Sequence, residues 1–172
     1  MRPKMPHSTS SANPGVKRSA GFSLIELLIV VAVILIIAAI AIPNFVRSRE
    51  RANEASAVAN LRDITTAQVV YSTTYGIGYA PALTNLGGNS LTPDSTQSGL
   101  IDSVLSSGVK TGYTYTYNII ATDINGNVQA YSLNADPVSP GTTGDRHFYT
   151  DQSAVIRQNL TGSAGAGDSP IQ

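Results

Sequence analysis

The chain of 172 residues contains no cysteine and only two histidines, His7 and His147. The lack of cysteine excludes disulfide bonds, thiolate metal sites and cysteine nucleophiles. The sequence also lacks a glycine-rich phosphate loop, a nucleophile elbow and a histidine–carboxylate metal motif. His147 falls on an expected strand, so we interpret it as an ordinary strand or surface residue. We therefore expect neither enzymatic activity nor a bound cofactor or metal ion.

An excess of one charge is also missing, because 11 Lys and Arg balance 11 Asp and Glu. The balance is uneven along the chain. The segment before Gly21 is basic and contains no acid, whereas from Phe22 onward seven basic residues face eleven acidic ones. A mildly acidic body lacks the basic surface that nucleic acids attract, so we expect no direct nucleic-acid binding. The length predicts one domain with room for an appendage.

A long apolar run is the most informative feature that is present. Residues 22–42 read FSLIELLIVVAVILIIAAIAI, in which only Ser23 and Glu26 are not apolar. As a helix this run would span about 31 Å, the thickness of the hydrocarbon core of a bilayer. The apolar region of a secretory signal peptide has only about 7–15 residues. We therefore predict a membrane span. Lys17 and Arg18 before it favour a cytoplasmic N-terminus, although three arginines after the span weaken that preference.

Glu26 lies inside the apolar run, where an ionised carboxylate is costly unless it has a partner. One interpretation places Glu26 close enough to the cytoplasmic surface to reach lipid headgroups. In the other, cleavage between Gly21 and Phe22 creates an α-amino group four residues before the carboxylate. That amine could pair with Glu26 of its own chain or of the next subunit. A buried ion pair of this kind can fix the register between helices.

The string GFSLIE at residues 21–26, preceded by Lys17 and Arg18, resembles the cleavage and methylation motif of prepilins. That family comprises type IV pilins and the pseudopilins of type II secretion. The resemblance covers residues 17–50. It implies that a membrane peptidase cuts after Gly21, that the new Phe22 amine is N-methylated, and that Glu26 pairs with that amine during assembly.

The resemblance also implies an organisation for the whole chain. Residues 1–21 would be a removed leader, 22–45 a transmembrane and assembly helix, and 46–172 a periplasmic or extracellular head that includes the second half of the helix. Pro43 falls where many of these pilins carry a helix-kinking proline. The C-terminal cysteine pair that is common in the family is missing here.

The function that we expect is a structural subunit of a type IV pilus. Its partners would be copies of itself in a filament, the lipid bilayer before assembly, the prepilin peptidase and methyltransferase, and an assembly machinery in the inner membrane. The precursor would lie in the inner membrane and the product on the cell surface. The alternatives are a periplasmic pseudopilin, a minor pilin, and a membrane-anchored binding protein or enzyme that keeps its leader.

Beyond Pro43 the sequence predicts a continuing amphipathic helix, because no glycine or proline occurs again before Gly76. One face of this helix is apolar at three- and four-residue steps, with Gln68 as its polar exception. The apolar positions are Ala57, Leu61, Ile64, Tyr71 and Tyr75. Glu50 and Glu54 could pair with Arg47 or Arg51, could pair with neighbouring chains, or could remain solvated.

The remaining sequence predicts a small antiparallel sheet of about four strands packed on this helix, an α+β pilin-like fold. Residues 76–112 read as a long loop with a short helix within 98–107. Alternating tyrosines from Tyr113 begin one hairpin, whose turn lies at 123–127 and whose second strand is 128–133. A second hairpin is expected from 146–150 and 154–157. The last dozen residues look frayed.

Two short motifs have ordinary explanations. Asp123, Asn125 and Asn127 have the alternate spacing of a calcium loop, but Val128 stands at the position of the invariant glycine, so a turn is the better interpretation. Residues 159–161 read Asn-Leu-Thr, a match to the N-glycosylation sequon that is weak without knowledge of the host.

Overall fold

A computed structural model describes residues 21–88 and 92–171 of the chain. It contains the long helix that the sequence predicts, α1 (Leu24–Tyr75), with 52 residues. Gly76 ends the helix in a left-handed conformation, with φ of 66°, and donates its N–H to the carbonyl of Ser72. The chain forms two compact units, residues 1–40 and 41–172, and α1 contributes to both. Each unit is described separately below.

In the first unit, the described part of α1 has no buried side chain. Its large apolar residues stay exposed all around the helix, from Leu24 at 81% to Ile40 at 66%. By length and composition α1 is able to cross a membrane, a property that the core helices of soluble proteins and signal sequences can share. Among the described residues, the core of the chain therefore leaves this apolar surface exposed.

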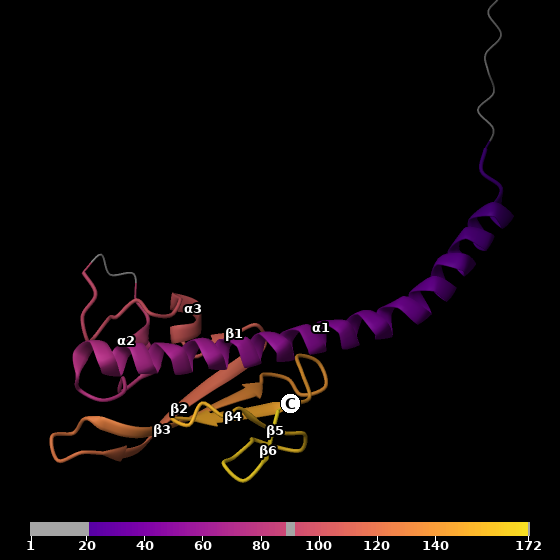
Figure 1. The fold of residues 1–172 in the computed structure, drawn as a ribbon. Helices are drawn as coiled ribbons and strands as arrows, with labels where there is room; N and C mark the ends of the chain where they lie inside the picture. Colours follow the sequence, from indigo (N-terminus) through magenta and orange to yellow (C-terminus); the bar gives the residue numbers. More distant parts are fainter. Residues whose placement is uncertain (1–20, 89–91, 172) are drawn as a thin grey trace, which may run out of the picture. The chain divides into compact units, whose positions relative to one another are not determined.

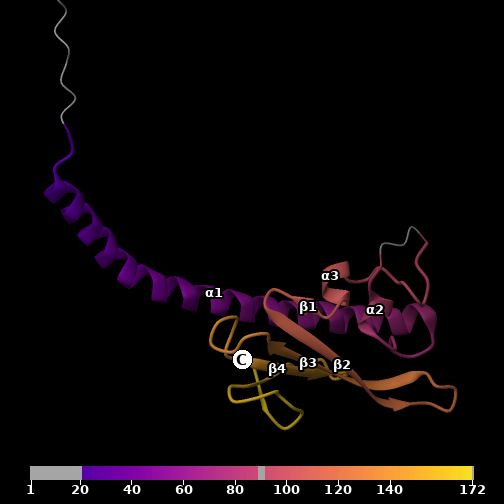
Figure 2. The same ribbon diagram turned by 180° about the vertical axis from the view of Figure 1, so that it is seen from behind.

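In the second unit, one face of α1 packs on an antiparallel sheet (Figures 1 and 2). The predicted apolar face is confirmed, because Ala57, Leu61, Ile64 and Tyr71 are fully buried and Tyr75 packs beside them. Gln68 is buried on the same face. Its Oε1 accepts a hydrogen bond of 2.8 Å from the N–H of Ala80, just beyond the helix.

The sheet has six strands in sequence order, with all neighbours antiparallel. The strands are β1 (Val109–Lys110), β2 (Tyr113–Thr122), β3 (Val128–Pro137), β4 (His147–Asp151), β5 (Arg157–Asn159) and β6 (Ser169–Pro170). The α+β architecture is thus confirmed, with six strands in place of about four. The two added strands have two residues each, too short for any periodicity to reveal them.

Side chains that point from the sheet toward α1 complete the core. Tyr115 of β2 stands opposite Ala135 of β3, and Ala135 stands opposite Phe148 of β4. All three are buried with the helix residues in one apolar cluster. The hydroxyl of Tyr115 accepts a 2.8 Å hydrogen bond from Nδ2 of Asn60, which links strand and helix inside the core. Burial raises the pKa of Tyr115 to about 12.

The first predicted hairpin is confirmed, since β2 and β3 pair around a turn at residues 123–127. Oδ1 of Asp123 accepts hydrogen bonds from the N–H groups of Asn125 and Asn127, both 2.8 Å long. Gly126 provides the positive φ, 85°, that the turn requires. The interpretation of this segment as a turn is therefore confirmed.

Two sequence predictions were wrong, the position of one strand and the state of the C-terminal segment. The strand expected at 154–157 is displaced to Arg157–Asn159, because Ala154 has a positive φ of 61° in the turn before it. The short helix expected within 98–107 is confirmed as the single turn α3 (Ser103–Ser106), and the loop before it contains a helical turn that was not predicted, α2 (Leu83–Leu86). The C-terminal segment is not frayed: β6 pairs with β5, and Ala164 is buried.

Candidate assembly surface

The predicted processing residues lie just before α1. Gly21 and Phe22 precede the helix and are exposed, with Phe22 at 78%. Lys17 and Arg18 lie outside the described residues. The N–H of Ser23 donates a 2.9 Å hydrogen bond to Oε2 of Glu26, and the carbonyl of Ser23 accepts from the N–H of Leu27.

This arrangement gives Glu26 a partner that the sequence reasoning missed. Ser23 is the residue before the first helical position and Glu26 is the third helical residue, so the pair matches the reach-back half of a capping box. The spacing Ser-x-x-Glu was the available signal. In the unprocessed chain, the carboxylate therefore satisfies one of the backbone donors that every helix start leaves unpaired.

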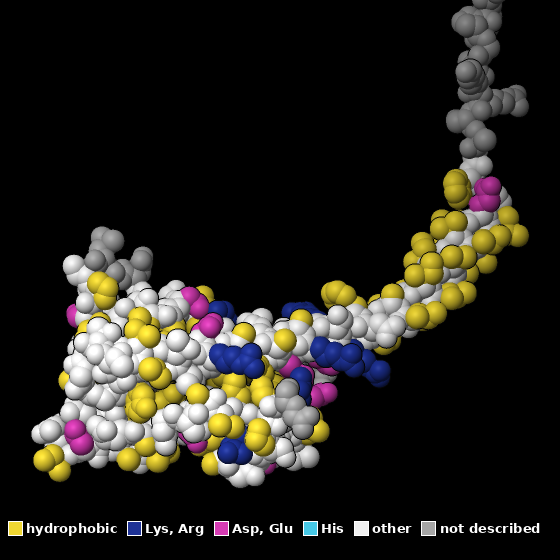
Figure 3. Space-filling view, viewed as in Figure 1, with side chains coloured by type: hydrophobic (Ala, Val, Ile, Leu, Met, Phe, Trp, Pro, Cys, Tyr) yellow, Lys and Arg dark blue, Asp and Glu magenta, His cyan; other side chains and the backbone are white. Residues whose placement is uncertain are grey.

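The helix that follows presents an apolar surface on every side. Figure 3 shows hydrophobic side chains covering this part of α1, with an acidic group at its start. An all-round apolar helix is typical of a membrane span or of a helix enclosed by other helices. Pro43 lies within α1 and does not end it, although proline has no N–H to donate to the carbonyl four residues earlier.

A charge pair between a buried glutamate and a partly exposed arginine anchors the start of the head. The Nε of Arg146 lies 2.8 Å from Oε2 of Glu54, and the backbone N–H groups of Asp145 and Arg146 donate to Oε1 at 3.0 and 3.1 Å. Glu54 is only 5% exposed. Burial opposes its ionisation, but these hydrogen bonds and the guanidinium charge outweigh burial and hold the pKa of Glu54 below its ordinary value.

The prediction that Glu54 pairs with Arg47, with Arg51 or with neighbouring chains, or stays solvated, was therefore wrong. Its partner lies 92 residues away in the sequence, where no local pattern could point to it.

Glu50 forms no ion pair within the described part of the chain. It lines, with Arg47 and Arg51, a cleft of about 650 Å³ that also includes Glu54, Asp145, Arg146 and Leu160. We call this feature the base cleft.

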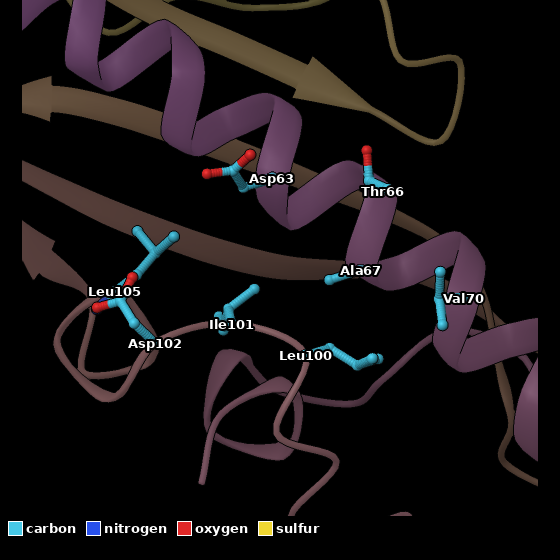
Figure 4. A pocket seen from close by; sticks show the side chains of 8 residues that line it. All are labelled: Asp63, Thr66, Ala67, Val70, Leu100, Ile101, Asp102 and Leu105. Carbon is cyan, nitrogen blue, oxygen red and sulfur yellow. The ribbon is translucent and has the colours of Figure 1, made fainter. Parts of the chain in front are cut away.

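A second hollow, of about 310 Å³, lies between α1 and the α3 region (Figure 4). Two carboxylates line it, Asp63 and Asp102, among mostly apolar side chains. Asp102 caps α3 by accepting from the N–H groups of Val104 and Leu105, and its other oxygen pairs with Lys110 at 2.7 Å. Its hydrogen bonds thus serve the local fold.

His147 is a strand residue, as expected, but it also has a specific partner. Its Nδ1 lies 2.6 Å from Oδ1 of Asp136 on the neighbouring strand β3. The other carboxylate oxygen of Asp136 accepts from the hydroxyl of Ser163, and Nδ2 of Asn134 donates to the carbonyl of Ala164. These contacts fasten the C-terminal segment to the sheet.

The side chain of Asn159, in the sequon, is already engaged. Its Oδ1 accepts from the N–H and the hydroxyl of Thr161, and its Nδ2 donates to Oδ1 of Asp168 at 3.1 Å. These hydrogen bonds give the side chain a structural role in the turn after β5.

Comparisons with known proteins agree with this geometry. Residues 16–42 match the family model described as "Prokaryotic N-terminal methylation motif". The chain is 32% identical over 140 residues to the "Type IV wide pilus major component PilA4" of Thermus thermophilus, which covers 81% of this chain and 93% of that protein. No solved structure matches the chain.

A second relative matches only near the N-terminus. The chain is 55% identical over 51 residues to the "Type IV major pilin protein PilA" of Myxococcus xanthus, a match that covers 30% of this chain and 23% of that relative. The chain thus spans less than a quarter of one relative and nearly all of the other. The similarity over the head rests on the Thermus protein.

Proposed function

This chain belongs to the type IV pilin family, as a structural subunit and not an enzyme, and on that premise we propose how it is processed and assembled. The precursor is stored in the inner membrane with α1 as its span. A membrane peptidase removes residues 1–21, and the new N-terminal Phe22 is N-methylated. The mature subunits then polymerise through the apolar part of α1 into a filament on the cell surface.

The exposed apolar surface of α1 is the observation that carries this proposal. Every described side chain up to Ile40 stays outside the chain's own core. A filament whose centre consists of such helices takes this surface from lipid into protein without exposing it to water. In both surroundings the helix satisfies its own backbone hydrogen bonds, so the transfer needs no refolding of α1.

Glu26 supplies the step that couples processing to assembly. Before cleavage, its carboxylate accepts from the N–H of Ser23. Cleavage after Gly21 creates a positive amine one residue before Ser23, and this amine is a stronger partner for a carboxylate than a neutral N–H. In the filament we propose that Glu26 pairs with the Phe22 amine of an adjacent copy, which fixes the stagger of neighbouring helices.

Two alternatives predict different outcomes. A pseudopilin would support secretion from the periplasm and would be missing from surface filaments. Both similar proteins are named as major pilus components, which favours the pilus. An anchored binding protein would keep the Gly21–Phe22 bond intact.

One experiment separates these functions: filaments are sheared from the host, and their main protein is analysed by N-terminal sequencing and mass spectrometry. We expect this chain to dominate the filaments, to begin at Phe22 and to carry one N-methyl group. A mature protein that begins upstream of Phe22 would contradict the proposed processing. Absence of the chain from sheared filaments would contradict the pilus.

A further inference from the structure

The two ends of the head each present a surface that the core of the described residues leaves exposed. The turn of the β2–β3 hairpin reaches past the C-terminal end of α1 in both Figure 1 and Figure 2. The base cleft lies at the opposite end, against the turns of α1 that contain Arg47 and Arg51. From Arg51 to Tyr75 the helix rises about 36 Å, so the turn cannot reach the base cleft of its own chain.

The hairpin turn presents an apolar side chain on a fixed support. Ile124 is fully exposed at the turn, and Ile120 on the adjacent strand is 64% exposed. Hydrogen bonds to Asp123 from two N–H groups hold the turn, so Ile124 projects from an ordered loop. Asp123 is the only charged residue between 111 and 135, which makes this end of the hairpin acidic. We call residues 120–125 the hairpin tip.

The base cleft has a surface that suits such a tip. Leu160, 69% exposed, supplies an apolar side chain. Within the cleft Arg146 already neutralises Glu54. On the helical wall two arginines, Arg47 and Arg51, stand beside one acid, Glu50, while Asp145 lines the other wall. Figure 3 shows Lys and Arg gathered along this part of α1.

We propose that the hairpin tip of one copy docks in the base cleft of a second copy, with Ile124 against Leu160 and Asp123 toward the arginines of α1. The two surfaces differ, so the contact is heterologous, and each subunit keeps a free tip and a free cleft for further copies. The two copies would be displaced along α1 by at least about 36 Å. The inference rests on the proposed filament, which places identical heads one above another.

Because the natural chain has no cysteine, introduced thiols can test this contact directly. Filaments of the double variant Ile124→Cys/Leu160→Cys are treated with a short bismaleimide and analysed on a denaturing gel. We expect a ladder of covalent multimers, because every subunit can be linked at both ends. Each single variant should give monomers only. The control pair Val109→Cys/Leu160→Cys uses a half-exposed residue of β1 and should give no ladder.

The outcomes separate the inference from the proposed function. Filaments that form and are not linked into a ladder overturn the docking contact and leave the pilin function intact. Failure of the unaltered chain to form filaments overturns the pilin function itself. A ladder from the control pair as strong as that from the test pair also overturns the specific contact.

A second variant keeps the test decisive if the double variant does not assemble. Ile124→Ser changes a side chain that is wholly outside the core, so the thermal unfolding of the subunit should stay unchanged. We expect fewer intact filaments after a fixed period of shearing, compared with Val109→Ser as the control. Equal filament recovery from Ile124→Ser, Val109→Ser and the unaltered chain would overturn the proposal.

Discussion

The two halves of α1 use apolar residues in opposite ways. Up to Ile40 the helix is apolar apart from Glu26 and has no buried side chain, whereas from Glu54 to Tyr71 it buries one face against the head. In the proposed function, lipid or other copies cover this first half. The second half is stabilised within the chain. One continuous helix thus combines an assembly element with the core of a folded head.

The two halves also place their carboxylates differently. Glu26 is exposed and accepts a hydrogen bond from a backbone group three residues earlier. Glu54 is buried and bound by a distant segment through Asp145 and Arg146. A locally held carboxylate can change partners when a stronger one appears, whereas Glu54 has its partners fixed by the fold. The predictions below test this division.

The largest effect on filament yield is expected from Gly21→Leu, a change just before the first half of α1. Nothing lies within 4 Å of a Cβ atom placed at Gly21, so the fold should be unaffected. A bulky side chain next to the scissile bond should block the peptidase, trap the precursor in the membrane and abolish filaments. Mass spectrometry of the membrane fraction measures the uncut chain. Gly162→Leu, also at an open position, is the control and should be processed normally.

Glu26→Ala should strongly reduce assembly while leaving membrane insertion unchanged or improved, because a charge in a membrane helix costs about 2.5–3.5 kcal/mol on insertion scales. In the filament it would leave the Phe22 amine buried without its partner, at a cost of about 3–5 kcal/mol. The readout is the ratio of sheared to membrane-bound protein.

Glu26→Gln separates the two roles of this residue. Glutamine keeps an oxygen that accepts from the N–H of Ser23 but has no charge for the amine. We expect it to assemble as poorly as the alanine variant. Filament yields near normal from Glu26→Gln would show that capping, and not charge pairing, is what assembly requires.

In the second half, Leu61→Ala should destabilise the head by about 2–5 kcal/mol, because it leaves a cavity at a fully buried position. Chemical unfolding of the full-length chain in detergent, followed by tyrosine fluorescence, measures this loss. Leu35→Ala removes the same atoms from the exposed first half and should leave head stability unchanged. A similar loss from both variants would contradict the division of α1 into two halves.

Glu54→Gln should cost about 1–3 kcal/mol at neutral pH, because Arg146 and two N–H groups lose a charged acceptor. The pKa of Glu54 is lower in the folded chain than its ordinary 4.5, so its ionisation stabilises the fold above that pH. This contribution is lost as the pH falls below about 4.5 through the lowered pKa. Glu50→Gln, one turn earlier on α1, is the control.

As the pH is lowered from 7, the free energy of unfolding should therefore fall more for the unaltered chain than for Glu54→Gln. The two curves should converge at the lowest pH, where Glu54 is protonated in both the folded and the unfolded chain. Parallel curves over the whole range would show that the carboxylate contributes no charge-dependent stability.

Periodicity alone predicted much of the head. Three- and four-residue spacing located the buried face of α1, including Gln68, and alternation from Tyr113 located the β2–β3 hairpin. Both patterns work because each element has one face toward the core. The error at 154–157 had a local cause, since Ala154 adopts a backbone conformation that its sequence does not suggest.

The sequence by itself determined the apolar span, the acid within it and the motif around Gly21, because these depend on composition and on spacing of a few residues. Only the tertiary structure decided that Arg146 neutralises Glu54, that the C-terminal segment joins the sheet as β6, and that the hairpin tip and the base cleft lie at opposite ends of the head. These contacts join residues far apart in the chain, and folding alone brings them together.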